Sequence, residues 1–173
     1  MNIAVIFAGG TGTRMNSKDK PKQFLKMHDK PIIIHTLEKF ENNENIDAIV
    51  IACIKDWIDY LSHLIEYYHM SKVKKIVPGG ETGQMSIYAG LNVAKDIADG
   101  QNAIVLIHDG VRPLINDDVI NNNITSVMKN GSAITSIKVT ETIMEINDDA
   151  SIKHIPDLSL IHISEPTRLR RIS

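Results

Sequence analysis

The sequence has very little of what marks disulfide-bonded, metal-cluster or membrane proteins. It contains one cysteine in 173 residues, and its aromatic content is 5%. Cys53 alone can form neither an internal disulfide nor a thiolate metal cluster, which fits a reducing cytoplasm. No apolar run approaches the ~20 residues that span a bilayer, and the N-terminus MNIAVIFAGG lacks the basic region of a signal peptide. We therefore expect a cytoplasmic chain without membrane association.

An excess of positive charge is also missing. Lys and Arg number 19 against 21 Asp and Glu, which gives a formal net charge of −2. Proteins that bind nucleic acid usually carry a basic surface, so no nucleic-acid partner is expected. A site for an anionic ligand must then be a local cluster of cations on a mildly acidic body. The length suits one domain with one sizeable core.

Apolar runs alternate with amphipathic segments and predict the order of secondary structure. The expected strands cover residues 3–7, 47–53, 74–77, 103–107 and 133–139. The expected helices cover residues 31–42, 56–69, 84–97 and 117–129, and a hairpin is expected from 142–146 and 152–155. This βαβαβαβαβ order predicts an α/β, Rossmann-like fold, with a mostly parallel sheet and helices on both faces. Ligands of such sheets bind at the carboxyl ends of the strands, where we expect a first loop (residues 8–24), a second loop (78–86) and a third loop (108–113) to converge.

The first loop, AGGTGTRMNSKDKPKQF, places three glycines and four cations directly after the first strand. Glycines let backbone N–H groups approach phosphate oxygens, Arg14 offers a bidentate fork, and the lysines, among them Lys22, add point charges. The dinucleotide fingerprint fails because Met15 stands where its third glycine should be, and the Gly-Lys-Ser/Thr of a P-loop is absent. The loop therefore predicts an extended cradle for a nucleoside triphosphate, with a solvated loop as the alternative on composition alone.

The second and third loops supply further polar groups. Ser86 falls in the first turn of a predicted helix, where its hydroxyl could contact a base or phosphate or could cap the helix. Asp109 ends a buried strand opposite the phosphate loop and is a natural Mg²⁺ ligand, since Mg²⁺ prefers carboxylates together with phosphate oxygens. Arg112 is expected to pair with Asp109 or to shape the loop. His108 is expected to be a structural hydrogen-bonding residue.

Taken together, AGGTGTRM…PKQF, GGETGQMSIYAG and HDGVRP resemble the cytidylyltransferases of sugar-alcohol phosphates. The resemblance runs from residue 1 to about 157 and implies a fold of the nucleotide-diphospho-sugar transferase type, CTP, Mg²⁺ and release of pyrophosphate. It implies that Arg14 and Lys22 stabilise the transition state and that Asp109 binds the metal. The residues that it implies for CTP binding are Phe7, Ala8, Gly9, Gly10, Gly80, Glu81, Thr82, Gly83, Gln84, Met85, Ser86 and Gly110.

Within this family, Ala8-Gly9-Gly10 and Val111 resemble the branch that uses ribitol 5-phosphate and makes CDP-ribitol. The alternative is the branch that uses methylerythritol phosphate in isoprenoid synthesis. An alternative of another class is a nucleotide-binding protein, or an inactive fragment, without catalysis. The resemblance also implies a projecting β-arm (residues 138–157) that completes the site of a partner in a homodimer, with Thr142 contacting the substrate.

The chain departs from the family pattern in two places. Gly83 stands where many members have arginine. After Asp157, where the family has a substrate-positioning arginine, Leu158 begins a tail, LSLIHISEPTRLRRIS, that resembles none of the family and shows no helix or strand periodicity. We predict a nucleotidyltransferase domain over residues 1–157, truncated at its C-terminal side, and a non-native tail over 158–173, with a divergent native tail as the alternative. We accordingly expect the polypeptide as written to be poorly stable, poorly active or both.

Overall fold

The central sheet of the computed structural model contains the predicted strands and one more. The structure describes residues 1–10, 20–138, 143–157 and 162–172. In the described part of the chain the main sheet has six strands in the order β5-β4-β1-β6-β10-β7. Their bounds are β1 Asn2–Ala8, β4 Ala48–Cys53, β5 Val73–Pro78, β6 Ala103–Asp109, β7 Ser132–Lys138 and β10 His162–Ile172. β1 pairs in parallel with both β4 and β6, and β4 with β5, which confirms the predicted parallel core.

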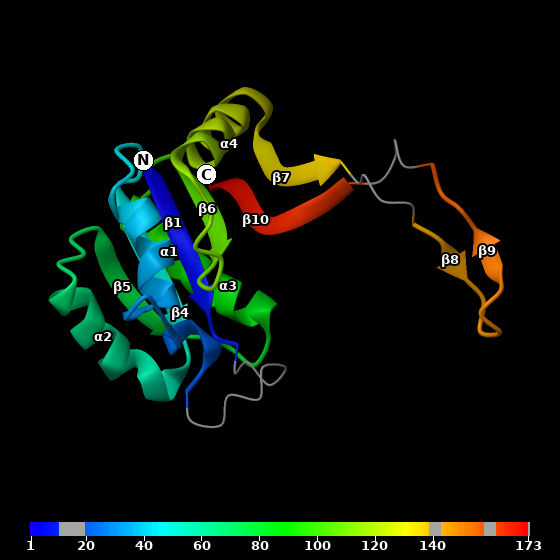
Figure 1. Cartoon of the computed structure of the whole chain (residues 1–173). Helices are drawn as coiled ribbons and strands as arrows, with labels where there is room; N and C mark the ends of the chain where they lie inside the picture. The colour runs from blue at the N-terminus through cyan, green and yellow to red at the C-terminus, as the bar shows by residue number, and fades with distance from the viewer. Residues whose placement is uncertain (11–19, 139–142, 158–161, 173) are drawn as a thin grey trace.

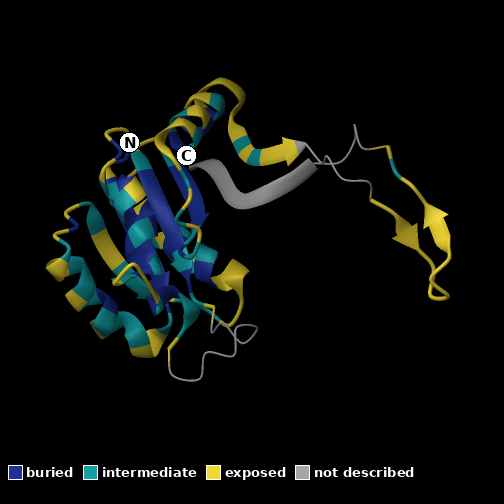
Figure 2. Ribbon diagram, viewed as in Figure 1, coloured by how far each residue is buried: buried dark blue, intermediate teal, exposed yellow. Residues whose placement is uncertain are grey.

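Helices cover both faces of the sheet, as predicted (Figure 1). The described helices are α1 Ile32–Glu41, α2 Ile58–Tyr67, α3 Gly83–Ala98 and α4 Asp117–Asn130. Alternate residues of β1 divide the core, because successive side chains of a strand point to opposite faces. Ala4 and Ile6 pack in the cluster that includes side chains of α1, α2 and α4, whereas Ile3 and Val5 pack in the cluster that includes side chains of α3. Figure 2 shows β1 as a mostly buried strand at the centre of these layers.

Local sequence signals explain where the helices begin and end. The Thr82 hydroxyl accepts a hydrogen bond from the backbone N–H of Met85 at 3.2 Å and caps α3. Asn116 caps α4 by accepting from the backbone N–H of Val119 at 3.0 Å. Gly131, with a φ of 83°, ends α4 in the left-handed conformation that glycine adopts without a steric penalty.

A short hairpin of β2 (Lys26–Met27) and β3 (Lys30–Pro31) was not predicted. Its two turn residues, His28 and Asp29, have φ angles of 50° and 62°. Turns of this kind usually carry Asn-Gly or Asp-Gly, and His28-Asp29 matches neither, so no turn was predicted here. One-turn 3₁₀ helices, η2 (Lys22–Phe24) and η3 (Lys55–Trp57), were also not predicted.

The tail forms strand β10, although its sequence predicted no regular element. β10 lies between β6 and β7 and runs antiparallel to both, with Leu169 opposite Leu106 of β6 and Ala133 of β7. Backbone hydrogen bonds on both sides define such a strand, and a central strand does not need the polar–apolar alternation that reveals a half-buried one. The non-native origin of residues 158–173 stays a prediction.

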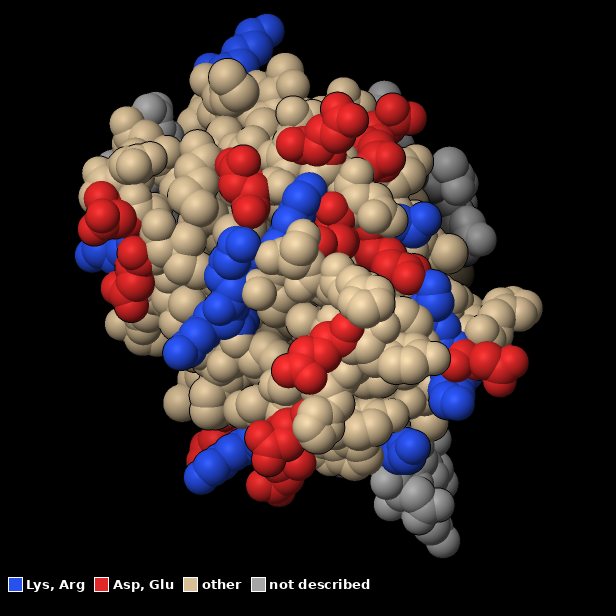
Figure 3. Space-filling model, turned by 90° about the vertical axis from the view of Figure 1, so that its left-hand side faces the viewer, with Lys and Arg blue, Asp and Glu red and all other residues tan. Residues whose placement is uncertain are grey.

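The predicted hairpin is present as β8 (Glu145–Ile146) and β9 (Ile152–His154), shorter than expected. In Figure 1 it stands apart from the body of the sheet, at the end of the strand pair β7 and β10. None of the helices in the described ranges combines the length and apolar character needed to cross a bilayer. The face that includes α2 and β5 carries interspersed positive and negative side chains (Figure 3), so neither sign of charge dominates it.

Candidate functional site

The first and second loops meet at two glycines and a serine. Gly9 follows β1 directly and Gly79 follows β5. A Cβ atom on Gly9 would lie 2.6 Å from Ser86 Oγ, and one on Gly79 would lie 2.9 Å from the same atom and 3.3 Å from the Cα of Gly9. These distances leave no room for a side chain, so both positions require glycine for close backbone approach. The predicted convergence of these two loops is confirmed.

Ser86 holds the second loop together from within. Its hydroxyl accepts a hydrogen bond from the backbone N–H of Gly80 at 3.1 Å and lies 3.1 Å from the carbonyl oxygen of Thr82, to which it donates. The side chain is 1% exposed. Of the two roles considered for Ser86, the structure therefore shows the local structural one, and a contact with a base or phosphate stays a prediction.

The remaining residues of the second loop present the start of α3 to solvent. Glu81, Thr82, Gly83, Gln84 and Met85 are all exposed. The first N–H groups of a helix lack intrahelical partners and carry the positive end of the helix dipole. An exposed helix start of this kind favours an anionic ligand, in agreement with the predicted nucleotide contact.

The third loop packs against the end of β1. The N–H of Gly110 donates to the carbonyl oxygen of Phe7 at 3.0 Å, and a Cβ on Gly110 would lie 3.1 Å from the Cβ of Ala8. All three loops therefore share the carboxyl edge of β1. Among the predicted CTP-binding residues, these contacts join Phe7, Ala8, Gly9, Gly80, Ser86 and Gly110.

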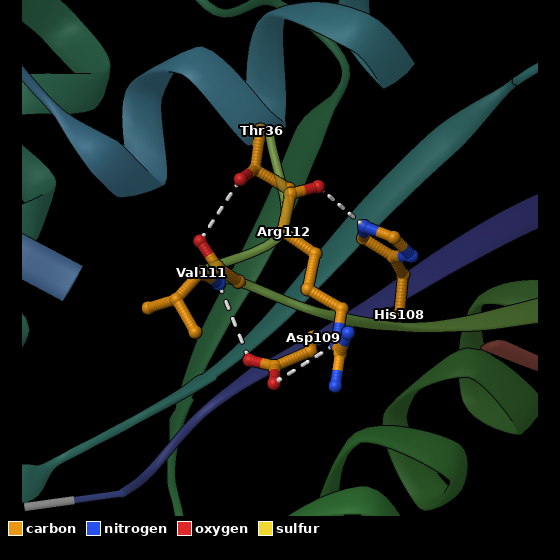
Figure 4. A network of polar contacts seen from close by, with 6 residues as sticks. Thr36, His108, Asp109, Val111 and Arg112 are labelled. Atoms are coloured by element: carbon orange, nitrogen blue, oxygen red, sulfur yellow. Dashed lines mark hydrogen bonds and ion pairs between the residues drawn. The ribbon is translucent and has the colours of Figure 1, made fainter. Parts of the chain in front are cut away.

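Asp109 lies at the centre of a polar network in the third loop (Figure 4). One carboxylate oxygen accepts a hydrogen bond from the N–H of Val111 at 3.2 Å, and the other lies 3.6 Å from Nε of Arg112. The predicted pairing of Asp109 with Arg112 is confirmed. Arg112 is the more exposed partner, with 45% of its side chain accessible against 19% for Asp109.

Two buried side chains hold the backbone of this loop from behind. The Thr36 hydroxyl donates to the carbonyl oxygen of Gly110 at 3.0 Å, and Nε2 of His108 bonds the carbonyl oxygen of Arg112 at 3.0 Å. The His108 ring also lies 5.2 Å from the ring of Phe40. The predicted structural role of His108 agrees with these contacts. The role of Thr36 was not predicted, because the pattern of apolar residues in a helix does not show which loop a polar side chain contacts.

Asp109 fits a magnesium ion bound jointly with phosphate. In the part of the chain that the structure describes, no group of three or more His, Cys, Asp or Glu side chains could hold a metal ion by itself. Mg²⁺ is commonly held by one or two carboxylates plus phosphate oxygens, with waters completing its shell. A single carboxylate beside a loop that is predicted to bind phosphate has the donor chemistry that such an ion needs.

The far end of the first loop is anchored by Lys22, Gln23 and Phe24 in η2. Lys22 is half-buried, and Phe24 stacks on Trp57 with ring centroids 4.8 Å apart. Gln23 is buried and its amide donates to the carbonyl oxygen of Ala8 at 2.7 Å. No role was predicted for Gln23, because its partner lies 15 residues away in the sequence.

Two residues with predicted roles fall outside the described part of the chain. Arg14 lies in residues 11–19 and Thr142 in residues 139–142. Their roles in transition-state stabilisation and substrate contact stay predictions, as does the role of Lys22.

The family model of 2-C-methyl-D-erythritol 4-phosphate cytidylyltransferase (IspD) matches residues 2–170. The chain belongs to the IspD family. A ribitol-5-phosphate cytidylyltransferase of Streptococcus agalactiae serotype Ia is 57% identical over 157 residues, which cover 91% of this chain and 65% of the relative. A 2-C-methyl-D-erythritol 4-phosphate cytidylyltransferase of Clostridium novyi is 42% identical over 153 residues, which cover 88% of this chain and 64% of the relative.

A solved structure supports the same family assignment. The crystal structure of 4-diphosphocytidyl-2C-methyl-D-erythritol synthase from Anaerococcus prevotii superposes with a TM-score of 0.81 at 26% identity, covering 98% of this chain and 69% of that one. The IspD-family chain thus spans about two thirds of the length of the proteins it matches.

Proposed function

We propose that this IspD-family chain carries the nucleotide-binding side of a cytidylyltransferase that transfers CMP from CTP to ribitol 5-phosphate, giving CDP-ribitol and pyrophosphate. The observation that carries the proposal is the meeting of Gly9, Ser86 and Gly110 at the carboxyl edge of β1. These residues bring three loops with complementary chemistry to one place. The first loop offers close backbone approach at Gly9, the second loop offers the exposed start of α3, and the third loop offers the carboxylate of Asp109.

The transfer needs positioned charge more than an enzymic nucleophile. A phosphate oxygen of ribitol 5-phosphate attacks the α-phosphorus of CTP, the bond from that phosphorus to the bridging oxygen breaks, and pyrophosphate leaves. The backbone at Gly10, where an added Cβ would meet none of the described residues within 4 Å, is accessible to the triphosphate. Arg14 and Lys22 would neutralise the charge that gathers on the phosphoryl oxygens in the transition state.

Mg²⁺ belongs to the same proposal, with Asp109 as the residue that would hold it. When bound, the ion would neutralise phosphate charge at the site. Arg112 keeps the Asp109 carboxylate at the edge of the loop, and the N–H of Val111 orients one of its oxygens. The other oxygen lies 3.6 Å from Nε of Arg112, a long contact that would leave it able to ligate a cation as well.

Ribitol 5-phosphate is favoured over methylerythritol phosphate by similarity. The streptococcal protein named for ribitol 5-phosphate is 57% identical, whereas the clostridial protein named for methylerythritol phosphate is 42% identical. The sequence features at Ala8-Gly9-Gly10 and Val111 point the same way. Methylerythritol phosphate remains the second candidate.

A homodimer formed through the hairpin β8–β9 is part of the proposal. Ile146 and Ile152 face each other across the hairpin, and each is 59% exposed. Two branched apolar side chains on a two-stranded hairpin lack a core of their own, so contact with a second copy would remove them from water. We place this assembly in the cytoplasm, where a single unpaired cysteine stays reduced.

Pyrophosphate release from CTP tests the function. The purified chain is incubated with CTP, Mg²⁺ and, in turn, ribitol 5-phosphate, methylerythritol phosphate and other alditol phosphates, with ATP, GTP and UTP as donor controls. We expect release with CTP, fastest with ribitol 5-phosphate, and slower from this chain than from one completed at its C-terminal side to the length of its relatives. Absence of release with every acceptor, from the completed chain as well, contradicts transferase activity, and calorimetric binding of CTP in that case indicates a nucleotide-binding protein.

A further inference from the structure

A buried amide joins the two ends of the first loop. Nε2 of Gln23 donates a hydrogen bond to the carbonyl oxygen of Ala8 at 2.7 Å, and the two residues are 15 apart in sequence. Gln23 is 1% exposed and Ala8 is 4% exposed. Between them run residues 9–22, which begin with the Gly9-Gly10 cradle and end with Lys22. This one hydrogen bond therefore fixes the separation of the two ends of the first loop.

Each partner of this bond belongs to a rigid part of the fold. Ala8 is the last residue of β1 and pairs with Cys53 of β4 in the parallel sheet. On the other side, Phe24 stacks on Trp57 and meets the edge of Tyr60 at 5.4 Å. Nζ of Lys20 also lies over the Tyr60 ring, 5.6 Å from its centre. Movement of this end of the first loop would break the aromatic packing as well as the hydrogen bond from the Gln23 amide to Ala8.

The chemistry of the contact requires a neutral donor. The carbonyl oxygen of Ala8 is buried, and an unpaired buried carbonyl is costly. An amide N–H satisfies it, whereas an ionised carboxylate of the same size would place two acceptors against each other. Gln23 therefore cannot be exchanged for glutamate or for an apolar side chain without losing the link.

We propose that Gln23 is a positioning residue for cytidylyl transfer, which acts by holding Lys22 at a fixed place relative to the Gly9-Gly10 cradle. This inference rests on the proposed function. Lys22 immediately precedes Gln23 in the same 3₁₀ turn, so displacement of Gln23 displaces Lys22. A displacement of about 1 Å of a charge-stabilising group can lower a rate by about 100-fold.

A double-mutant cycle tests this inference. Gln23→Met keeps the length of the side chain and removes the donor, and Lys22→Ala removes the charge. We expect Gln23→Met to lower kcat/KM for CTP by about 10- to 100-fold in the native background. In the Lys22→Ala background the same change should lower it by less than about twofold, because residues that act as a unit show non-additive effects. If the double variant loses kcat/KM by the product of the two single-variant factors, Gln23 supports the fold only and the proposal is overturned.

A matched control separates positioning from general support of the fold. Asn123 is another buried amide, 8% exposed, which joins α4 to β7 by donating to the hydroxyl of Thr135 at 2.8 Å. Asn123→Ala should reduce thermal stability and leave kcat/KM nearly unchanged. An equal loss of kcat/KM in the folded Asn123 and Gln23 variants would overturn the proposal.

A second variant and a binding measurement cover two cases in which the kinetic cycle cannot be read. If Gln23→Met does not fold, Gln23→Glu serves as the second variant, because it keeps the shape and also lacks a donor when ionised. If the unmodified chain binds CTP without releasing pyrophosphate, the proposed transfer fails, and the cycle is then read from the Kd for CTP. Non-additive losses of CTP affinity would support the link between Gln23 and Lys22, and additive losses would overturn it.

Discussion

The hydroxyl of Thr36, in the middle of α1, donates a hydrogen bond to the carbonyl oxygen of Gly110 at 3.0 Å, across 74 residues of sequence. Thr36 is fully buried, and Gly110 follows Asp109 directly. Helix α1 therefore supports the backbone that carries the proposed metal ligand. The site depends on the packing of this helix as well as on the loops that form it.

Replacing Thr36 by valine keeps the shape of the side chain and removes this bond. We expect Thr36→Val to lower the free energy of unfolding by about 1–3 kcal/mol, because it leaves a buried carbonyl unpaired. Thr36→Ser, which keeps the hydroxyl, should retain the affinity for Mg²⁺ better than Thr36→Val does. Urea unfolding and Mg²⁺ titration of activity measure the two effects. Identical midpoints for Thr36→Val and the native chain would show that the bond contributes nothing.

Asp109→Asn should weaken metal binding without unfolding the chain. The amide can still accept from the N–H of Val111, but it no longer carries the charge that attracts a divalent cation. We expect the Mg²⁺ concentration for half-maximal pyrophosphate release to rise by at least about tenfold, since charge pairs near a protein surface contribute several kcal/mol. Asp118→Asn, at an exposed position in the first turn of α4, is the control. It should need the same Mg²⁺ concentration for half-maximal pyrophosphate release as the native chain.

Gly90 brings α3 into close contact with β1. A Cβ on Gly90 would lie 2.4 Å from Cγ1 of Val5. We expect Gly90→Ala to destabilise the fold by about 1–3 kcal/mol through overpacking, and Val5→Ala in the same chain to relieve part of that cost. Gly83→Ala, where an added Cβ meets no atom of the described residues within 4 Å, should be neutral or slightly stabilising. Chemical denaturation compares the four variants, and strict additivity of Gly90→Ala and Val5→Ala would contradict the contact.

Burial raises the pKa of the Cys53 thiol from 9.0 to about 11. The folded chain then holds this proton where the unfolded chain releases it. The stability that this difference contributes is complete below pH 9 and is lost as pH rises from about 9 to about 11, by at most about 1.4 kcal/mol per pH unit. Alkylation by iodoacetamide at pH 8.5 should be slow in the native state and fast in urea. Rapid native labelling would refute the burial of the thiol, and Cys53→Ala should remove this part of the pH dependence.

The exposed pair Ile146 and Ile152 predicts how the chain assembles. Ile146→Lys with Ile152→Glu replaces the apolar pair by a charged pair that still suits the hairpin. We expect sedimentation to show a dimer for the native chain and a monomer for this variant. Asp148→Lys, in the exposed turn of the same hairpin, changes charge without changing the apolar pair and should leave the dimer intact. A native monomer at micromolar concentration would contradict assembly through this surface.

The sequence predicted the layers of the fold and the edge where the site lies. Apolar runs such as IDAIVIAC identified the strands, and the βαβ order placed the first, second and third loops at one edge. The contacts that shape the site could not be predicted in this way. Gln23 with Ala8 and Thr36 with Gly110 depend on tertiary packing, which no local pattern encodes. Strand β10 and the hairpin of His28 and Asp29 were missed because neither carries the alternation or the turn residues that signal such elements.

The contact of Gly9 and Gly79 with Ser86 limits how the specificity of the proposed nucleotide site can be altered. A methyl group at either glycine would displace the Ser86 hydroxyl, and that hydroxyl holds the N–H of Gly80. A single substitution at any of these positions therefore disturbs two loops at once. An engineered variant that accepts a different base would have to change these positions together, with the compensating substitution chosen before the activity is screened.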